Sequence, residues 1–199
     1  MKIAILGGAF NPPHLGHQLI AQQVLDFTPM ETVWLTPCWR HTFDKTLALA
    51  KDRAAITKTL VNKHIKYCGD EIDNQLSGNT IELMELLDKK YPQHQFSFII
   101  GSDNLKQFHQ WGDWKKLITC WNFWVFPRPR FGFNLAKYDL AKPEYRFKLI
   151  RHPLLIHSNI SSTNIRKRIK QNLNITGLVP HKVKQYIKMH QLYYEKRDR

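Results

Sequence analysis

Short apolar runs alternate with segments of helical periodicity over residues 1–126, and this alternation restricts the possible folds more than any other feature. Apolar runs stand at 2–6, 32–35, 65–68, 96–100 and 122–126. Helices are expected between them, near 15–27, 47–62, 80–90 and 103–119. Such an order predicts an α/β sheet of parallel strands joined by right-handed crossovers.

After residue 126 the pattern loosens into a turn-rich connection. "PLLIH" (153–157) predicts one more short strand, and two basic helices are expected near 162–171 and 180–190. A hydrophobic content of 43% is enough for a full core. We therefore expect one domain over residues 1–199: a Rossmann-like parallel sheet of about five to six strands flanked by helices, with a small helical C-terminal part over about 159–199.

Several classes of protein are disfavoured by composition. No apolar stretch approaches the roughly 20 residues of a membrane span, and the N-terminus has no signal-peptide pattern, so a cytoplasmic protein with no membrane partner is expected. Cys38, Cys68 and Cys120 include no C-x-x-C pair, which argues against a disulfide framework or a cysteine-based zinc site. We expect reduced, mostly buried thiols.

Positive charge is concentrated in the last third of the chain. The formal net charge is +14, and residues 137–199 hold 15 Lys and Arg against 4 Asp and Glu. Such a surface attracts nucleic acid or a phosphate-rich small ligand. A solvated basic face that only aids solubility is the alternative.

"GGAFNPPHLGH" (7–17) connects the first strand to the first helix, a position at which α/β proteins bind anions. It is neither a G-x-G-x-x-G loop nor a Walker A loop. Gly7 and Gly8 allow close approach of a ligand to the backbone, and Pro12 and Pro13 stiffen the turn. The segment predicts a rigid pocket lined with backbone amides.

His14 and His17 are three residues apart, so both project from one side of the helix start. Two imidazoles there can donate hydrogen bonds to a phosphate. Zinc is the rival ligand, but it needs a third donor and only His41 could supply one; no metal site is predicted. One helix-capping and one surface histidine is the other reading.

"SSTNIRKR" (161–168) predicts a second anion site, because Ser161, Ser162 or Thr163 can cap a helix that carries Arg166 one turn further on. An ordinary capped basic helix is the alternative. Gly101, Ser102 and Asp103 end the strand at 96–100, and Asp103 is suited to accept hydrogen bonds from a ribose or to cap the next helix.

"GGAFNPPHLGH" resembles the nucleotidyltransferase signature G-x-F-[DN]-P-x-H-x-G-H. "IIGSDNLKQFHQW" (99–111), "NISSTNIRKRI" (159–169) and "LVPHKVKQYIKMHQLY" (178–193) resemble further stretches of the bacterial nicotinate/nicotinamide mononucleotide adenylyltransferases. The resemblance implies that the 5′-phosphate of a pyridine mononucleotide attacks the α-phosphorus of ATP, giving a dinucleotide of NAD biosynthesis and pyrophosphate. It also implies Mg²⁺ bound with the ATP.

The resemblance carries site roles onto matching positions. His17 would bind the α-phosphate and His14 would assist, as the catalytic residues. The ATP-binding set, which also includes both histidines, would be completed by Gly7, Gly8, Ala9, Phe10, Gly101, Asp103, Ser162, Thr163 and Arg166. The mononucleotide would be bound by Asn11, Arg40, Lys45, Thr80 and Trp111.

One segment departs from the family pattern. Nicotinate-preferring members carry Asn-x-x-Pro-Pro-His-Lys after the second strand, whereas this chain reads "TPCWRHTFDK" (36–45). The choice between nicotinate and nicotinamide stays open here. Two other functions also stay open: a phosphopantetheine or cytidylyl type of nucleotidyltransferase, and a basic nucleic-acid-binding module, which is the less favoured. The sequence leaves a homo-oligomer possible.

Overall fold

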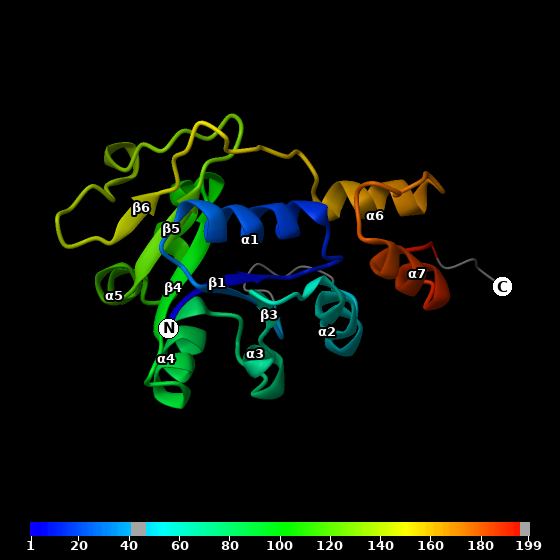
Figure 1. The fold of residues 1–199 in the computed structure, drawn as a ribbon, viewed down its shortest axis with the longest axis horizontal. Coiled ribbons are helices and arrows are strands. Elements are labelled where there is room, and N and C mark those ends of the chain that lie inside the picture. Colours follow the sequence, from blue (N-terminus) through cyan, green and yellow to red (C-terminus); the bar gives the residue numbers. More distant parts are fainter. Residues whose placement is uncertain (41–46, 196–199) are drawn as a thin grey trace.

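The protein forms a single six-stranded parallel sheet in the computed structural model, which describes residues 1–40 and 47–195 (Figure 1). The strands are β1 (Lys2–Gly8), β2 (Thr32–Pro37), β3 (Ile65–Tyr67), β4 (Gln95–Gly101), β5 (Asn122–Phe126) and β6 (Phe147–Leu149). Their order is β3-β2-β1-β4-β5-β6, so the direction of winding reverses between β1 and β4. The predicted Rossmann-like α/β class is confirmed.

Helices fill connections between the strands, and two more follow the last strand. They are α1 (Leu15–Phe27), α2 (Ala50–Thr57), α3 (Asp70–Asp73), α4 (Thr80–Lys90), α5 (Trp114–Cys120), α6 (Ser162–Lys170) and α7 (His181–Met189), with 3-10 helices at Lys58–Leu60, Ser102–Gln110 and Ala136–Tyr138. The helix expected at 103–119 is divided in two, because Asp113 at the start of α5 has a left-handed backbone with φ of 45°.

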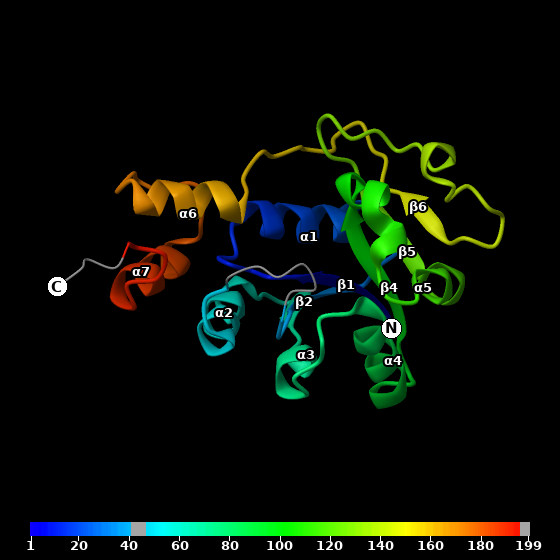
Figure 2. The same ribbon diagram turned by 180° about the vertical axis from the view of Figure 1, so that it is seen from behind.

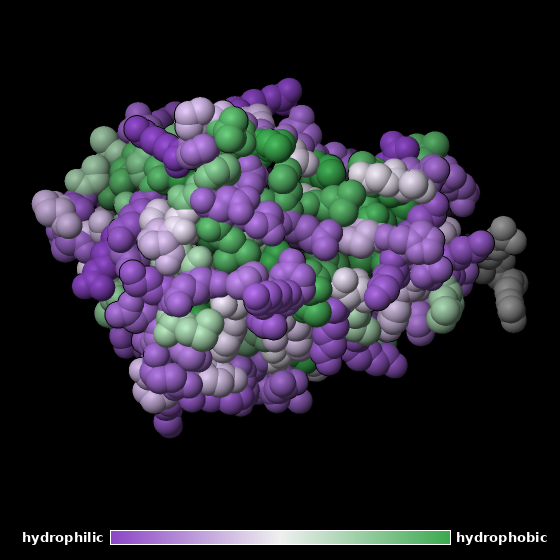
Figure 3. All heavy atoms as spheres, viewed as in Figure 1, coloured by the Kyte–Doolittle hydropathy of each residue, from purple (hydrophilic) through white to green (hydrophobic). Residues whose placement is uncertain are grey.

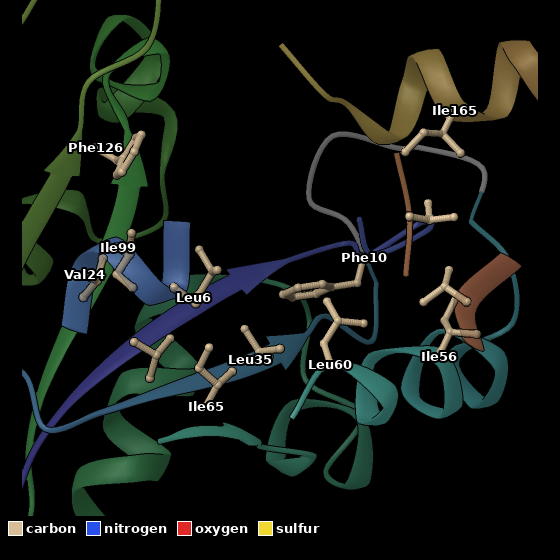
Figure 4. Close-up of a cluster of buried hydrophobic side chains, with 14 of the residues drawn as sticks. Leu6, Phe10, Val24, Leu35, Ile56, Leu60, Ile65, Ile99, Phe126 and Ile165 are labelled. Atoms are coloured by element: carbon tan, nitrogen blue, oxygen red, sulfur yellow. The ribbon is translucent and has the colours of Figure 1, made fainter. Parts of the chain in front are cut away.

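The two faces of the sheet bury separate hydrophobic cores. Alternate residues of β1 point to opposite faces, as the period of two in a strand requires. Ala4 and Leu6 belong to a core shared with α1, α2, α6 and α7, whereas Ile3 and Ile5 belong to a core shared with α4 and α5. Figure 4 shows the first core, in which Phe10 and Leu6 lie with residues from β2, β4 and α6.

The C-terminal helices lie together at the end of the molecule away from β6 (Figures 1 and 2). Ile165 of α6 and Ile187 of α7 are buried in the same core as Ala4 of β1. The Tyr186 hydroxyl of α7 donates to Asp52 Oδ1 of α2 at 2.9 Å. The two helices therefore pack on the α/β sheet through both apolar and polar contacts.

The prediction of a strand at 153–157 is wrong. The sixth strand lies earlier, at β6, and Leu154 and Ile156 are 71% and 59% exposed. The backbone N–H and C=O of Ile156 are instead paired with the side-chain amide of Gln23 in α1, at 2.5 and 3.0 Å. A side chain thus replaces the ladder partner that a strand would need.

The surface is mixed in polarity. Apolar side chains gather above and over α1 on the face seen in Figure 3, among polar ones.

Cys38 and Cys68 are buried as predicted, whereas Cys120 is exposed. Within residues 1–40 and 47–195, no helix has the length and apolarity that crossing a membrane would require.

Truncating Ile187 tests whether the C-terminal helices unfold together with the sheet. We expect Ile187→Ala to destabilise the protein by roughly 2–4 kcal/mol through the cavity that it leaves. One cooperative thermal transition should remain, followed by near- and far-UV circular dichroism. Met189→Ala is the matched control because that side chain is 76% exposed. An early, separate transition of the helices in Ile187→Ala would contradict a single domain over 1–199.

Candidate active site

A cavity of about 400 Å³ opens at the carboxyl ends of β1 and β4, where the strand order reverses. This is the place at which open α/β sheets bind ligands. Ten residues of the predicted site line it: Gly7, Gly8, Ala9, His14, His17, Arg40, Thr80, Gly101, Trp111 and Ser162. Its volume is in the range of small-molecule sites.

The two histidines contact each other at the start of α1. The backbone N–H of His14 donates to Nδ1 of His17 at 3.1 Å, and the two rings lie 3.8 Å apart between centroids. Since Nδ1 of His17 accepts, its proton is assigned to Nε2, which is then the donor nitrogen. Phe10, buried in the core, packs its ring 4.7 Å from that of His17 and so supports it from beneath.

Glycines at the two ends of the segment 7–17 make room for side chains. A Cβ at Gly16 would lie 2.9 Å from Nδ1 of His14, so the residue just before His17 has to be small. A Cβ at Gly7 would lie 2.6 Å from Cζ of Phe98. The space beside Gly7 is thus occupied by an aromatic ring, a packing reason that adds to the predicted approach of a ligand.

Both histidines are neutral at pH 7. Burial first, and then the positive charge of Arg128, lowers the pKa of His14 to about 4. Burial, followed by the charges of His14 and Arg128, holds the pKa of His17 well below its usual value. The folded state therefore loses stability through His14 as the pH falls from 6.5 toward 4, because this histidine binds its proton more tightly in the unfolded chain.

The first turn of α6 packs on the segment 7–17, which carries His14 and His17 and is called the two-histidine loop below. Ser161 caps the helix, with its hydroxyl accepting the Asn164 backbone N–H at 3.2 Å. The Ser162 hydroxyl donates to the Pro12 carbonyl at 2.8 Å, and Arg166 Nη1 donates to the Asn11 carbonyl at 2.7 Å. Two sequence motifs far apart in the chain are thereby brought to the same cavity.

Arg128 is a charged cavity residue that the sequence analysis missed. It follows β5 and its Nη1 donates to Asp103 Oδ2 at 3.4 Å. A Cβ at Gly101 would lie 2.3 Å from Asp103 Oδ1 and 2.8 Å from Arg128 Cδ, so a glycine at this position makes room for the pair. Ser102 accepts the Arg128 N–H at 2.9 Å. The sequence could have indicated this pair, because Asp103 and Arg128 follow β4 and β5, and adjacent parallel strands end at the same edge of a sheet.

Asp103 and Arg128 also line a second cavity of about 320 Å³, beside Pro129, Arg130, Phe131, Ser158 and Asn159. Because Arg128 borders both cavities, the two adjoin. The charge of Arg128 lowers the pKa of both histidines, which line the main cavity with it.

The other end of the main cavity is aromatic and polar. Trp111 stacks on Phe108 with centroids 4.9 Å apart and has Phe98 edge-on. Thr80 begins α4. Glu71, which the sequence analysis did not single out, also lines the cavity although it is buried, and its Oε1 has no hydrogen-bond partner in the described part of the chain.

Five predicted residues do not line the main cavity. Phe10 lies in the core, Asn11 Oδ1 accepts the Ala48 backbone N–H, and Asp103 lines the second cavity. Nη2 of Arg166 donates to Oγ1 of Thr163 at 3.4 Å. Lys45, and the alternative zinc ligand His41, lie outside the described residues. The predicted contacts of all these side chains with nucleotide stay predictions.

A neutral histidine pair, a capped helix N-terminus and an arginine lie together at the reversal point of a parallel sheet, as in the anion-binding sites of open α/β proteins. Residues 5–168 match the model of the cytidylyltransferase-like family. The chain belongs to this family.

Relatives and solved structures agree with this assignment. A probable nicotinate-nucleotide adenylyltransferase of Cytophaga hutchinsonii is 30% identical, with 97% of this chain and 98% of the relative covered. One of Flavobacterium johnsoniae is 32% identical, with 98% and 100% covered. Nicotinic acid mononucleotide adenylyltransferase of Plasmodium falciparum, solved with NaAD, has the same fold, with a TM-score of 0.78 at 22% identity over 96% of this chain and 97% of its own. The predicted relationship to these adenylyltransferases is confirmed.

Replacing Glu71 tests the electrostatics of the cavity wall. Burial above all, with a smaller contribution from Glu82, raises the pKa of Glu71 to about 7 against the opposing Trp39 N–H and Arg53 charge. The folded state thus binds this proton more tightly than the unfolded one, and stability is lost as the pH rises from 4.5 to 7. Glu71→Gln should remove that loss, which is on the order of 2 kcal/mol between pH 5 and pH 8.

The measurement is the thermal midpoint of both proteins at the two pH values. The advantage of Glu71→Gln should be larger at pH 8 than at pH 5 by roughly 4–8 °C. An equal difference at both pH values would show that the Glu71 carboxyl titrates normally.

Proposed function

We propose that the protein transfers AMP from ATP to nicotinate mononucleotide, giving nicotinate adenine dinucleotide and pyrophosphate. The observation that carries the proposal is the docking of the α6 N-terminus on the two-histidine loop, through Ser162 and Arg166. It provides two adjacent anion sites, as a nucleoside triphosphate requires. The names of the relatives favour nicotinate over nicotinamide as the pyridine substituent.

The reaction needs positioning and charge neutralisation rather than a base. An oxygen of the mononucleotide 5′-phosphate, already ionised, attacks the α-phosphorus of ATP, and the bond to the bridging oxygen of pyrophosphate breaks. His17 Nε2 donates to a non-bridging oxygen of the α-phosphate and stabilises the charge in the transition state. The neutral form of His17 suits this role, because its Nε2–H is already a hydrogen-bond donor and the ring need not take up a second proton first.

The leaving pyrophosphate is held at α6. The Ser162 and Thr163 backbone amides begin this helix and lack helical partners, so they are available to the β- and γ-phosphates. Arg166 supplies a cation one turn on, and Arg128, which lines the cavity, supplies another. Asp103 holds the adenosine ribose in this arrangement.

Mg²⁺ enters together with ATP in this proposal. Such an ion is held mainly by phosphate oxygens and waters, as is common for Mg²⁺. Bound there, it would neutralise part of the triphosphate charge.

The mononucleotide occupies the other end of the cavity. Trp111 packs against the pyridine ring, Thr80 lies near the ring substituent, and Arg40 pairs with the phosphate. Asn11 and Lys45 complete the proposed set. The protein acts in the cytoplasm on these small molecules, and the basic C-terminal third needs no nucleic-acid partner; an assembly into homo-oligomers stays a prediction.

Removing the transition-state donor should lower turnover strongly. We expect His17→Ala to reduce kcat on the order of 10²- to 10³-fold while the thermal midpoint stays within a few degrees. Pyrophosphate release with ATP, Mg²⁺ and nicotinate mononucleotide is the measurement, with nicotinamide mononucleotide in parallel. Near-wild-type turnover in the variant would refute the mechanism, and absence of release by the wild type with both mononucleotides would refute the function.

Removing Arg166 should act on ATP rather than on the mononucleotide. Arg166→Ala is expected to raise the KM for ATP about tenfold or more, the cost of a charge-assisted contact, with little change in the KM for the mononucleotide. Steady-state kinetics with each substrate varied in turn separates the two. Lys167→Ala, an exposed neighbour on α6, is the matched control. A rise confined to the mononucleotide KM would contradict the phosphate assignment.

A further inference from the structure

Arg53 of α2 is a charged side chain buried where an apolar one would be expected. It is 1% exposed, and among the described residues its guanidinium donates only to backbone carbonyls. The acceptors are Ala48, Ala9, Cys38 and Trp39, at 3.0, 2.9, 2.6 and 3.0 Å. A single side chain therefore ties together three segments, two of which line the cavity.

These segments include the parts of the chain assigned to the substrates. Ala9 belongs to the two-histidine loop, Cys38 and Trp39 follow β2, and Ala48 precedes α2. Ala9 and Cys38 also line the cavity. Since the fork geometry of a guanidinium fixes the directions of its donors, Arg53 sets the positions of these carbonyls relative to one another.

Trp39 is held from its other side by Glu71. A carboxyl oxygen of Glu71 accepts the Trp39 backbone N–H, and the positive charge of Arg53 acts on the carboxyl. The Trp39 backbone is thus held at its N–H by a carboxyl group and at its C=O by a guanidinium, both buried. The next residue is Arg40, whose side chain lines the cavity.

Stability alone does not account for this arrangement. Well-packed apolar side chains usually stabilise a core as well as or better than a buried pair of opposite charges, because both charges lose their hydration. Oε1 of Glu71 has no partner in the described part of the chain, which adds to the cost. Such a cost on the wall of a cavity is typical of groups kept for their function.

We propose that Arg53 and Glu71 are positioning residues that fix the backbone of Trp39 and thereby aim Arg40 at the phosphate of the pyridine mononucleotide. The proposal rests on the proposed function. Neither residue contacts the substrate in this scheme. The two-histidine loop keeps its other anchors to α6, from Ser162 and Arg166, so ATP binding depends on the pair far less.

The test compares the binding of the two substrates by titration calorimetry. Arg53→Met should raise the Kd for nicotinate mononucleotide at least tenfold and the Kd for a non-hydrolysable ATP analogue less than threefold. Tyr186→Phe is the matched control: it removes the hydrogen bond to Asp52, on the residue next to Arg53 in α2, and should leave both Kd values unchanged.

A conservative pair of variants separates the positioning role of Glu71 from its charge. Glu71→Gln keeps an oxygen that can accept the Trp39 N–H and should retain the wild-type Kd for the mononucleotide, whereas Glu71→Leu should raise it about as much as Arg53→Met. If Arg53→Met does not fold, Arg53→Lys and this pair carry the test, since one ammonium cannot reproduce the four contacts of the guanidinium.

A double-mutant cycle with Arg40 shows whether the pair acts through it. In an Arg40→Met background the second substitution, Arg53→Met or Glu71→Leu, should change the mononucleotide Kd less than twofold. Additive effects, or equal weakening of both substrates, would overturn the positioning role. A wild-type protein that binds the mononucleotide but shows no adenylyl transfer would count against the proposed reaction alone; failure to bind it at all would overturn both.

Discussion

The contact between the first turn of α6 and the loop after β1 is the interaction on which the site depends. Two hydrogen bonds carry it, from Ser162 to the Pro12 carbonyl and from Arg166 to the Asn11 carbonyl, at 2.8 and 2.7 Å. Each anion site alone is an ordinary feature of an α/β protein. Held together they match a chain of phosphates, and the side chains that join them are themselves part of the proposed phosphate site.

The electrostatics of the cavity prepare it for an anion. Arg128 lowers the pKa of His14 and of His17, in addition to burial, so that neither carries a charge of its own before substrate binds. A phosphate placed among them is attracted by Arg128 and opposes its effect on the histidines. The buried Arg53 and Glu71 serve the loops rather than the ligand. Charges that reduce the stability of the free protein thus shape both halves of the cavity.

Local sequence predicted some features well and others poorly. The five strands of the first 126 residues are where the apolar runs indicated, because a strand buried on both faces needs such a run. "PLLIH" has the same local character and is not a strand, because Gln23, distant in sequence, satisfies the backbone of Ile156. Arg128 and Glu71 lie in no sequence motif. They line the cavity only because the fold brings the segment after β5 and helix α3 beside it.

The sequence by itself determined the parallel α/β sheet, the strand-end loop that carries His14 and His17, and the capped helix with Arg166. These features depend on periodicity, turn residues and caps, which act over a few residues. Only the tertiary structure decided that the two motifs share one cavity, that both histidines are neutral, and that Gly7 makes room for Phe98. Burial and contact between distant segments have no local signature, because they arise only when the chain closes on itself.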